Sequence, residues 1–286
     1  MATFSRIMAA TDFSDSSLEA VRRTAALLKA GQAESGCILH VTEAGIMESL
    51  RQLLGQSPDL SAALEQRLQA LAKDIADETG AILETRLLSG PIARSLAEAM
   101  TAEDLIVLGS QGSHRARELL LGTTAQQLVY HSPGAALVVR RPASSSWRKV
   151  LVATDFSEPS RRALERAVQL APEAEIELVH VYASRFEPSM HYAGVDETLV
   201  QEYRQRARLE AEREMRAFME ASGAPAVKSR LESGYAPHRL RDMVSEDEID
   251  LLVVGKQGQS MTRDLMLGSV SMSLLQRADC DVLVVS

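Results

Sequence analysis

The stretch DLIVLGSQG at residues 104–112 returns, with few changes, as DLLVVGKQG at residues 250–258. In both, four consecutive apolar residues follow an aspartate and lead into a glycine-rich segment. Consecutive apolar residues without alternation are typical of a strand that is buried on both faces, as in a parallel sheet. The chain therefore carries, twice, the pattern of a buried parallel strand that ends in a tight glycine turn.

Other landmarks repeat in the same order around these stretches. IMAATDFS at 7–14 returns as VLVATDFS at 150–157, and an HV pair at 40–41 returns at 180–181. Such self-similarity indicates a tandem duplication of a unit about half the chain long. The segment RPASSSW at 141–147 is rich in proline, alanine and serine and marks the seam. We predict two domains, 1–142 and 147–286, called here the first and second repeats.

Composition excludes several partners. The 286 residues carry a formal net charge of −8, and their lysines and arginines are scattered, so neither nucleic acid nor an anionic membrane surface is an expected partner. The two cysteines lack the CxxC spacing of a zinc or redox site. No apolar run reaches the length of a signal peptide core or a membrane span. We expect a cytoplasmic protein.

Short apolar runs alternate with segments of helical period in both repeats, which is the pattern of a parallel sheet covered by helices. We predict an α/β fold: two tandem doubly wound domains, each a five-stranded parallel sheet with helices on both faces. The expected strands are 6–10, 37–42, 81–87, 105–108 and 136–139, then 149–153, 176–182, 227–231, 251–254 and 282–285. In the first repeat the expected helices are 16–29, 61–79, 91–100 and 118–131.

The last strand of each repeat, at 137–139 and 282–285, is apolar at consecutive positions. Such a strand commonly lies at a sheet edge, where an uncovered apolar surface invites aggregation. Either each strand is buried by its own helices, or the two edges cover each other. The second alternative predicts a built-in pseudo-twofold dimer.

Both repeats carry the spacing G-x2-G-x9-G-[S/T] after a buried strand. Glycine permits positive φ and leaves no Cβ between backbone N–H groups and an anion. The carboxyl end of a parallel strand is also where doubly wound sheets bind ligands. The motif indicates a phosphate site, with tight turns and close packing as the structural alternative. Its residues are Gly109, Gly112, Gly122 and Thr123, and Gly255, Gly258, Gly268 and Ser269.

Asp12 and Asp155 follow the first strand of each repeat and share the same sheet edge. A carboxylate there can accept hydrogen bonds from a ribose hydroxyl or an adenine amino group, whereas it would repel phosphate. The alternative is that these aspartates begin the following helices. We favour ligand contact for the aspartates and helix capping for Ser14 and Ser157.

With these motifs, the chain resembles a tandem member of the universal stress protein family over its whole length, in the ATP-binding branch. The resemblance implies an adenine-nucleotide alpha-hydrolase-like fold, an ATP, ADP or AMP ligand with Mg²⁺, and pairing through the final strands. It also implies that Asp12 and Asp155 lie near the adenosine and that Val41 and Val181 line the base pocket. Ser113 and Gln259 stand where many members carry arginine, and Ala125 stands where the second repeat has Ser271.

We therefore predict a nucleotide-binding regulator of the stress response, and a homodimer of the chain is a further expectation. There are two alternatives: a slow ATPase or phosphotransferase that uses His114 or an aspartate to orient water, and a scaffold with one empty pocket. No catalytic base is common to both loops, and no metal-ligand set stands out, since we expect His40 and His180 to be structural. The predicted nucleotide-binding residues are Thr11, Asp12, Val41, Gly109, Gly112, Gly122, Thr123, Thr124, Thr154, Asp155, Val181, Gly255, Gly258, Gly268, Ser269 and Ser271.

Overall fold

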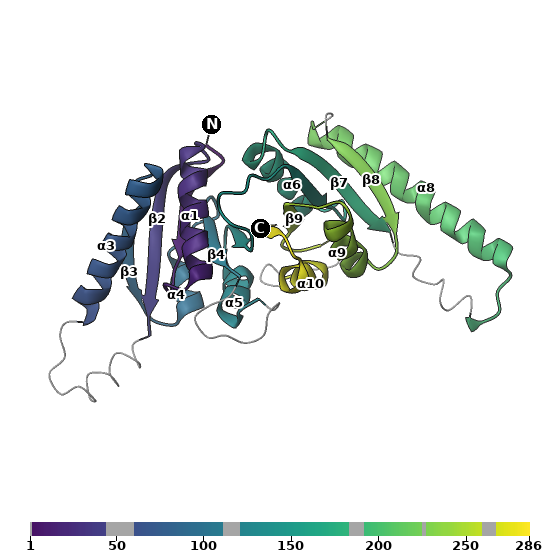
Figure 1. Cartoon of the computed structure of the whole chain (residues 1–286). Coiled ribbons are helices and arrows are strands. Elements are labelled where there is room, and N and C mark those ends of the chain that lie inside the picture. The colour runs from purple at the N-terminus through teal and green to yellow at the C-terminus, as the bar shows by residue number, and fades with distance from the viewer. Residues whose placement is uncertain (1, 44–59, 111–120, 183–191, 225–226, 259–266) are drawn as a thin grey trace. The chain divides into compact units, whose positions relative to one another are not determined.

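The computed structural model in Figure 1 describes residues 2–43, 60–110, 121–182, 192–224, 227–258 and 267–286. The chain divides into two compact units. The first contains residues 1–146, 275–284 and 286, and the second contains residues 147–274 and 285. Each unit is described by itself.

The first unit is built on a sheet whose strands follow the order β3-β2-β1-β4-β5, with every neighbouring pair parallel. The chain adds β2 and β3 on one side of β1 and then β4 and β5 on the other side. Because parallel crossovers are right-handed, the helices that precede this change of direction lie on one face of the sheet and those that follow it lie on the other. Accordingly α1 packs on α3, and α4 packs on α5. The elements are β1 (Phe4–Ala10), α1 (Asp15–Lys29), β2 (Ala33–Thr42), α3 (Leu60–Thr79), β3 (Glu84–Ser89), α4 (Ile92–Glu98), β4 (Leu105–Gly109), α5 (Thr123–His131) and β5 (Ala135–Val139).

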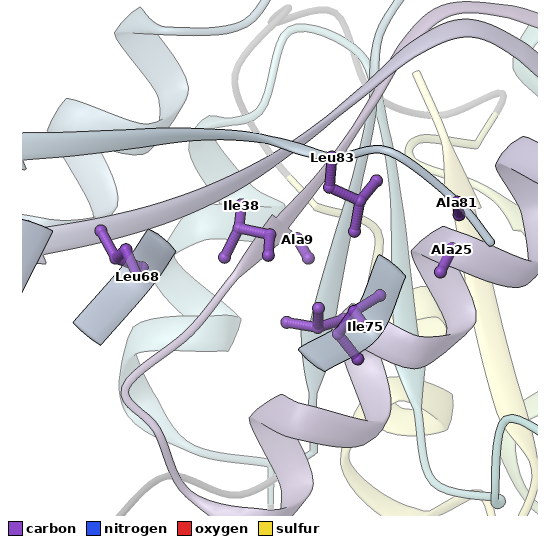
Figure 2. Close-up of a cluster of buried hydrophobic side chains, with 8 residues drawn as sticks. Ala9, Ala25, Ile38, Leu68, Ile75, Ala81 and Leu83 are labelled. Carbon is purple, nitrogen blue, oxygen red and sulfur yellow. The ribbon is translucent and has the colours of Figure 1, made fainter. Parts of the chain in front are cut away.

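A core cluster fixes α1 and α3 on the sheet. Figure 2 shows the side chains that β1, β2, the two helices and the segment before β3 contribute to it. Burying each of its valine, leucine and isoleucine side chains stabilises the fold by roughly 1.5–3 kcal/mol, and its alanines contribute less. The packed face of β1 therefore holds its carboxyl end in place. The cluster comprises Ala9, Val21, Ala25, Ile38, Leu68, Ile75, Ala81 and Leu83.

The last strand of the chain, β10 (Asp281–Val285), pairs antiparallel with β5. Val282 lies opposite Val138, and Leu283 lies opposite Leu137. All of β5 and β10 is buried. The two apolar strands therefore cover each other's edges, as the second alternative predicts, while the pseudo-twofold dimer stays a prediction.

The second unit repeats four of the five strands in the order β9-β6-β7-β8, again with parallel neighbours, whereas β10 up to residue 284 belongs to the first unit. Together with the first unit, this confirms the predicted doubly wound α/β fold class. The domain boundaries at 142 and 147 stay a prediction. The elements are β6 (Lys149–Ala153), α6 (Glu158–Leu170), β7 (Glu175–Tyr182), α8 (Glu197–Ser222), β8 (Lys228–Ser233), α9 (Ala236–Glu246), β9 (Leu251–Gly255) and α10 (Ser269–Arg277).

The third strand of the first repeat begins later than predicted. Residues 81–83 precede β3, and Ala81 and Leu83 are nevertheless buried because they pack in the core cluster. Ile82 between them is 84% exposed. This alternation of buried and exposed side chains imitates a strand in the sequence, although the ladder with β2 begins only at Glu84.

Asp104, which is fully buried just before β4, makes the stability of the fold depend on pH. Burial alone would raise the pKa of Asp104, but hydrogen bonds from Arg6, at 2.6 Å, and from the Thr101 N–H, at 2.8 Å, outweigh it and lower the pKa. A carboxyl group with a lowered pKa in the folded state contributes stability above its unfolded pKa, and this contribution is lost as the pH falls through the folded value.

We expect Asp104→Asn to lower the free energy of unfolding by about 2 kcal/mol at neutral pH, because bonds to a charged acceptor are lost. The difference from the unsubstituted protein should shrink as the pH falls below about 4. Urea denaturation at several pH values measures both. Glu98→Gln, which breaks the exposed Arg94–Glu98 pair, is the control and should have little effect. A deficit that persists undiminished at low pH would contradict the assignment.

Candidate functional site

The predicted site residues gather at the carboxyl ends of two neighbouring strands in each unit. In the first unit β1 and β4 are neighbours, and in the second β6 and β9 are neighbours. In both cases the connections leave these two strands in opposite directions, and in doubly wound sheets the ligand crevice lies at the carboxyl ends of such a strand pair. The aspartate turn follows one strand and the glycine loop follows the other.

The aspartate turn of the first unit is closed by local hydrogen bonds. One Asp12 oxygen, Oδ1, accepts from the N–H and the hydroxyl of Ser14, at 3.1 and 2.5 Å. Ser14 caps α1 through its side chain, as predicted. Asp12 itself is exposed. The capping alternative therefore applies to the serine, and the carboxylate stands outside the helix.

The second unit reproduces this turn and adds a contact with its loop. Oδ1 of Asp155 accepts from the N–H and hydroxyl of Ser157, at 3.1 and 2.5 Å, and Ser157 caps α6. A Cβ placed on Gly258 would lie 2.4 Å from Oδ2 of Asp155. That distance is too short for any real side chain, so the glycine loop and the aspartate approach each other directly.

The first glycine of each loop packs against the start of a helix. A Cβ on Gly109 would lie 2.6 Å from backbone atoms of Ser16, in α1. A Cβ on Gly255 would lie 3.0 Å from the backbone of Pro159 and Ser160, in α6. These two glycines therefore allow close packing of strand end and helix, which is the structural alternative considered for the motif. The second glycine of the loop, where described, borders the aspartate instead.

The N–H group of the third glycine donates to the carbonyl of the residue that follows the first glycine. The Gly122 N–H donates to the Ser110 carbonyl at 3.2 Å, and the Gly268 N–H donates to the Lys256 carbonyl at 2.8 Å. This places the N-termini of α5 and α10 at the crevice. The N–H groups of a first helical turn, together with the positive end of the helix dipole, favour an anion. Three exposed hydroxyl residues begin these helices: Thr123, Thr124 and Ser269.

The two loops differ where they can be compared. The Ser271 hydroxyl, in α10, donates to the Gly255 carbonyl at 2.8 Å and is buried. Its counterpart Ala125 has no hydroxyl and makes no such bond. In the second unit alone, this side chain therefore links the helix after the loop to the first glycine of the loop. Lys256 is only 6% exposed, and burial lowers its pKa. The corresponding residue in the first loop is Ser110, which has no charge.

The other predicted residues lie nearby or outside the described residues. Val41 and Val181 are half-buried at the carboxyl ends of β2 and β7. Thr11 and Thr154 are buried, and their hydroxyls bond within the turn. Gly112, like His114, lies outside the described residues. Ligand contact by every one of the sixteen residues stays a prediction.

The aspartate turn has one feature that escaped sequence reasoning, the backbone of its phenylalanine, and one that agrees with the expected structural role of His40 and His180. Phe13 and Phe156, which follow the aspartates, have positive φ values of 61° and 65°. His40 and His180 lie within hydrogen-bond distance of the backbone carbonyl that precedes each aspartate. The recurrence of TDFS in both repeats is the one sequence signal for this turn, but phenylalanine rarely adopts this conformation and gives no hint of it.

Over the described ranges, no three histidine, cysteine, aspartate or glutamate side chains gather into a group that could hold a metal ion. No helix within those same ranges is both long enough and apolar enough to span a membrane.

Comparisons with known proteins agree with the repeats. The family model described as universal stress protein family matches residues 3–140 and again 146–286. A universal stress protein of Mycolicibacterium smegmatis is 26% identical over 235 residues, covering 80% of this chain and 78% of that protein. The universal stress protein YxiE of Bacillus subtilis is 32% identical over 146 residues, covering 49% of this chain and 99% of its own.

Among solved structures, a universal stress protein from Archaeoglobus fulgidus aligns with a TM-score of 0.70 at 20% identity, covering 99% of this chain and 98% of that one. This likeness extends the fold over both repeats. Because the family model matches each half of the chain in turn, the chain belongs to the universal stress protein family as a tandem member.

Proposed function

We propose that this chain is a regulator of the stress response that binds an adenine nucleotide, ATP or its di- or monophosphate, at two sites. One observation supports this most: in the second unit the glycine loop approaches Asp155 so closely that a Cβ on Gly258 would lie 2.4 Å from the carboxylate. The loop that suits phosphates and the acceptor that suits a ribose thus border the same space.

The chemistry of the two sides matches the two ends of a nucleotide. Asp155 offers a carboxylate that can accept from hydroxyl or amino groups, and Val181 offers an apolar surface for a base. The backbone N–H groups after Gly268, at the N-terminus of α10, suit phosphate oxygens. A single small ligand with hydroxyls, an apolar ring and phosphates satisfies all of these. Bound Mg²⁺ would neutralise part of the phosphate charge.

The first unit offers the same set with Asp12, Val41 and Gly122. Because the turn, the third-glycine bond and the helix N-terminus recur there, two nucleotides per chain are expected. A cytoplasmic location, a pseudo-twofold pairing of the repeats and a homodimer of the chain complete the proposal.

Calorimetric titration with ATP tests it, with Asp155→Asn as the informative variant. Asparagine keeps an oxygen for the two Ser157 bonds but removes the negative charge, so the turn should persist. We expect affinity at the second site to fall by about tenfold, the equivalent of about 1.4 kcal/mol. The control is Asp279→Asn, an exposed aspartate, which should bind as the unsubstituted chain does.

Native mass spectrometry of the purified chain counts the nucleotides that bind. Two per chain is the expected result. No binding at low-millimolar ATP, or binding that is indifferent to both Asp155→Asn and Gly258→Ala, would refute the proposal.

A further inference from the structure

The residue after each predicted ligand aspartate holds an unfavourable backbone conformation. Across the described residues, positive φ outside glycine occurs at Phe13, Phe156 and Glu248. Two of these three are equivalent positions of the repeats. Bulky L-residues rarely adopt this region, and such conformations persist only where the surroundings determine them. The surroundings of the two phenylalanines therefore need an explanation.

On one side, a chain of buried hydroxyls holds the turn. In the first unit the Phe13 N–H donates to the Thr11 hydroxyl at 3.0 Å, which lies 2.9 Å from the Ser17 hydroxyl. Ser17 in turn donates to the Ser14 carbonyl at 2.9 Å. Since the Ser17 proton is used in that bond, the Thr11 hydroxyl donates to Ser17. The second unit repeats each bond within 0.1 Å.

On the other side, a histidine holds the residues before and after the aspartate. Nδ1 of His40 lies 2.7 Å from the Thr11 carbonyl, and Nδ1 of His180 lies 2.7 Å from the Thr154 carbonyl. A carbonyl only accepts, so Nδ1 carries the proton in both. The same rings contact the phenylalanines, with centroids 4.9 Å apart for Phe13 and 4.2 Å apart for Phe156.

We propose that His40 and His180 are positioning residues for Asp12 and Asp155. Each histidine fixes the carbonyl before its aspartate and the ring after it, so the aspartate between them has little freedom to turn away from the crevice. The proposal rests on the proposed function, because it assigns the orientation of that ligand-binding carboxylate to a residue that does not itself touch the ligand.

Three substitutions in the full chain separate the two contacts of His180. His180→Asn keeps an N–H donor close to the position of Nδ1 and removes the ring. His180→Phe keeps a ring against Phe156 and removes the donor, while His180→Ala removes both. The control is His238→Ala, since His238 is exposed on α9.

The readout is ATP affinity at the second site, measured also in an Asp155→Asn background. We expect His180→Ala to weaken binding by about tenfold in the natural background and to have no further effect beside Asp155→Asn, because residues that act through one another are not additive. The ATP affinity of His180→Asn should lie close to that of the unsubstituted chain, because asparagine keeps the N–H donor. An equal loss in both backgrounds, or no loss in either, would overturn the proposal.

A second measurement keeps the positioning role testable if the chain binds no nucleotide, which would refute the proposed function alone. Hydrogen exchange of the Phe156 amide should be at least about tenfold faster in His180→Ala than in His238→Ala, because the opened turn exposes that N–H. Exchange that is unchanged would overturn the positioning role. Should His180→Ala fail to fold, His180→Asn and His180→Phe give the same comparison.

Discussion

Gly258→Ala is expected to remove nucleotide binding at the second site while the first site still binds. The added methyl group would lie 2.4 Å from Oδ2 of Asp155, so one of the two must move. Oδ1 of the same carboxylate accepts two hydrogen bonds from Ser157. Because the two oxygens belong to one rigid group, moving Oδ2 away from the methyl group displaces the whole carboxylate. We expect the second-site affinity to fall by at least about tenfold.

Native mass spectrometry gives the clearest measurement, because the first site is an internal control. The count should drop from two nucleotides per chain to one at an ATP concentration that fills both sites in the unsubstituted protein. The thermal midpoint should change little, since the clash is with the end of a side chain. Two nucleotides bound with unchanged affinity would show that the Asp155 carboxylate plays no part in binding.

Asp281→Ala is expected to cause the largest loss of stability. Asp281 is fully buried at the start of β10, where Oδ1 accepts from the Arg140 and Arg141 N–H groups at 2.8 and 3.0 Å. Oδ2 lies 3.4 Å from the guanidinium of Arg23, which is only 5% exposed, and burial lowers the pKa of Arg23. Removing the carboxylate leaves a buried cation without that counter-charge.

The expected cost is about 3–5 kcal/mol, the range for breaking one side of a buried ion pair. In a chain of this size that corresponds to a fall in the thermal midpoint of roughly 10 °C. Scanning calorimetry measures it, with Asp279→Ala as the control, because Asp279 is exposed two residues earlier. Equal midpoints for the two variants would show that the pair contributes nothing to stability.

Most of the architecture could be predicted from the sequence because its signals are local. The apolar runs at β4 and β9 and the glycines after them place a buried strand and its turn without knowledge of the rest of the chain. The pairing of β5 with β10 was predictable as one of two alternatives, since consecutive apolar residues need cover on both faces. The start of β3 was not, because Ala81 and Leu83 are buried by the core cluster rather than by a strand ladder.

The site was predictable in its parts but not in its assembly. The motif and the sheet topology place Gly258 and Asp155 on one edge, yet their direct approach depends on the path of the loop. The left-handed Phe156 was beyond prediction, since its intrinsic preference opposes that conformation and tertiary contacts, with Thr154, His180 and Phe218, hold it. Ser271 was singled out for its hydroxyl, but the bond from that hydroxyl to the Gly255 carbonyl was not foreseen, and ligand contact by Ser271 stays a prediction.

The membership of β10 in the first unit also sets an order of events during synthesis. β5 leaves the ribosome 146 residues before β10, a delay of about 7–29 s at ordinary elongation rates. Throughout that interval an apolar strand, Ala135–Val139, lacks the neighbour that covers it in the finished fold. Until β10 emerges, that uncovered strand edge is open to association with other chains.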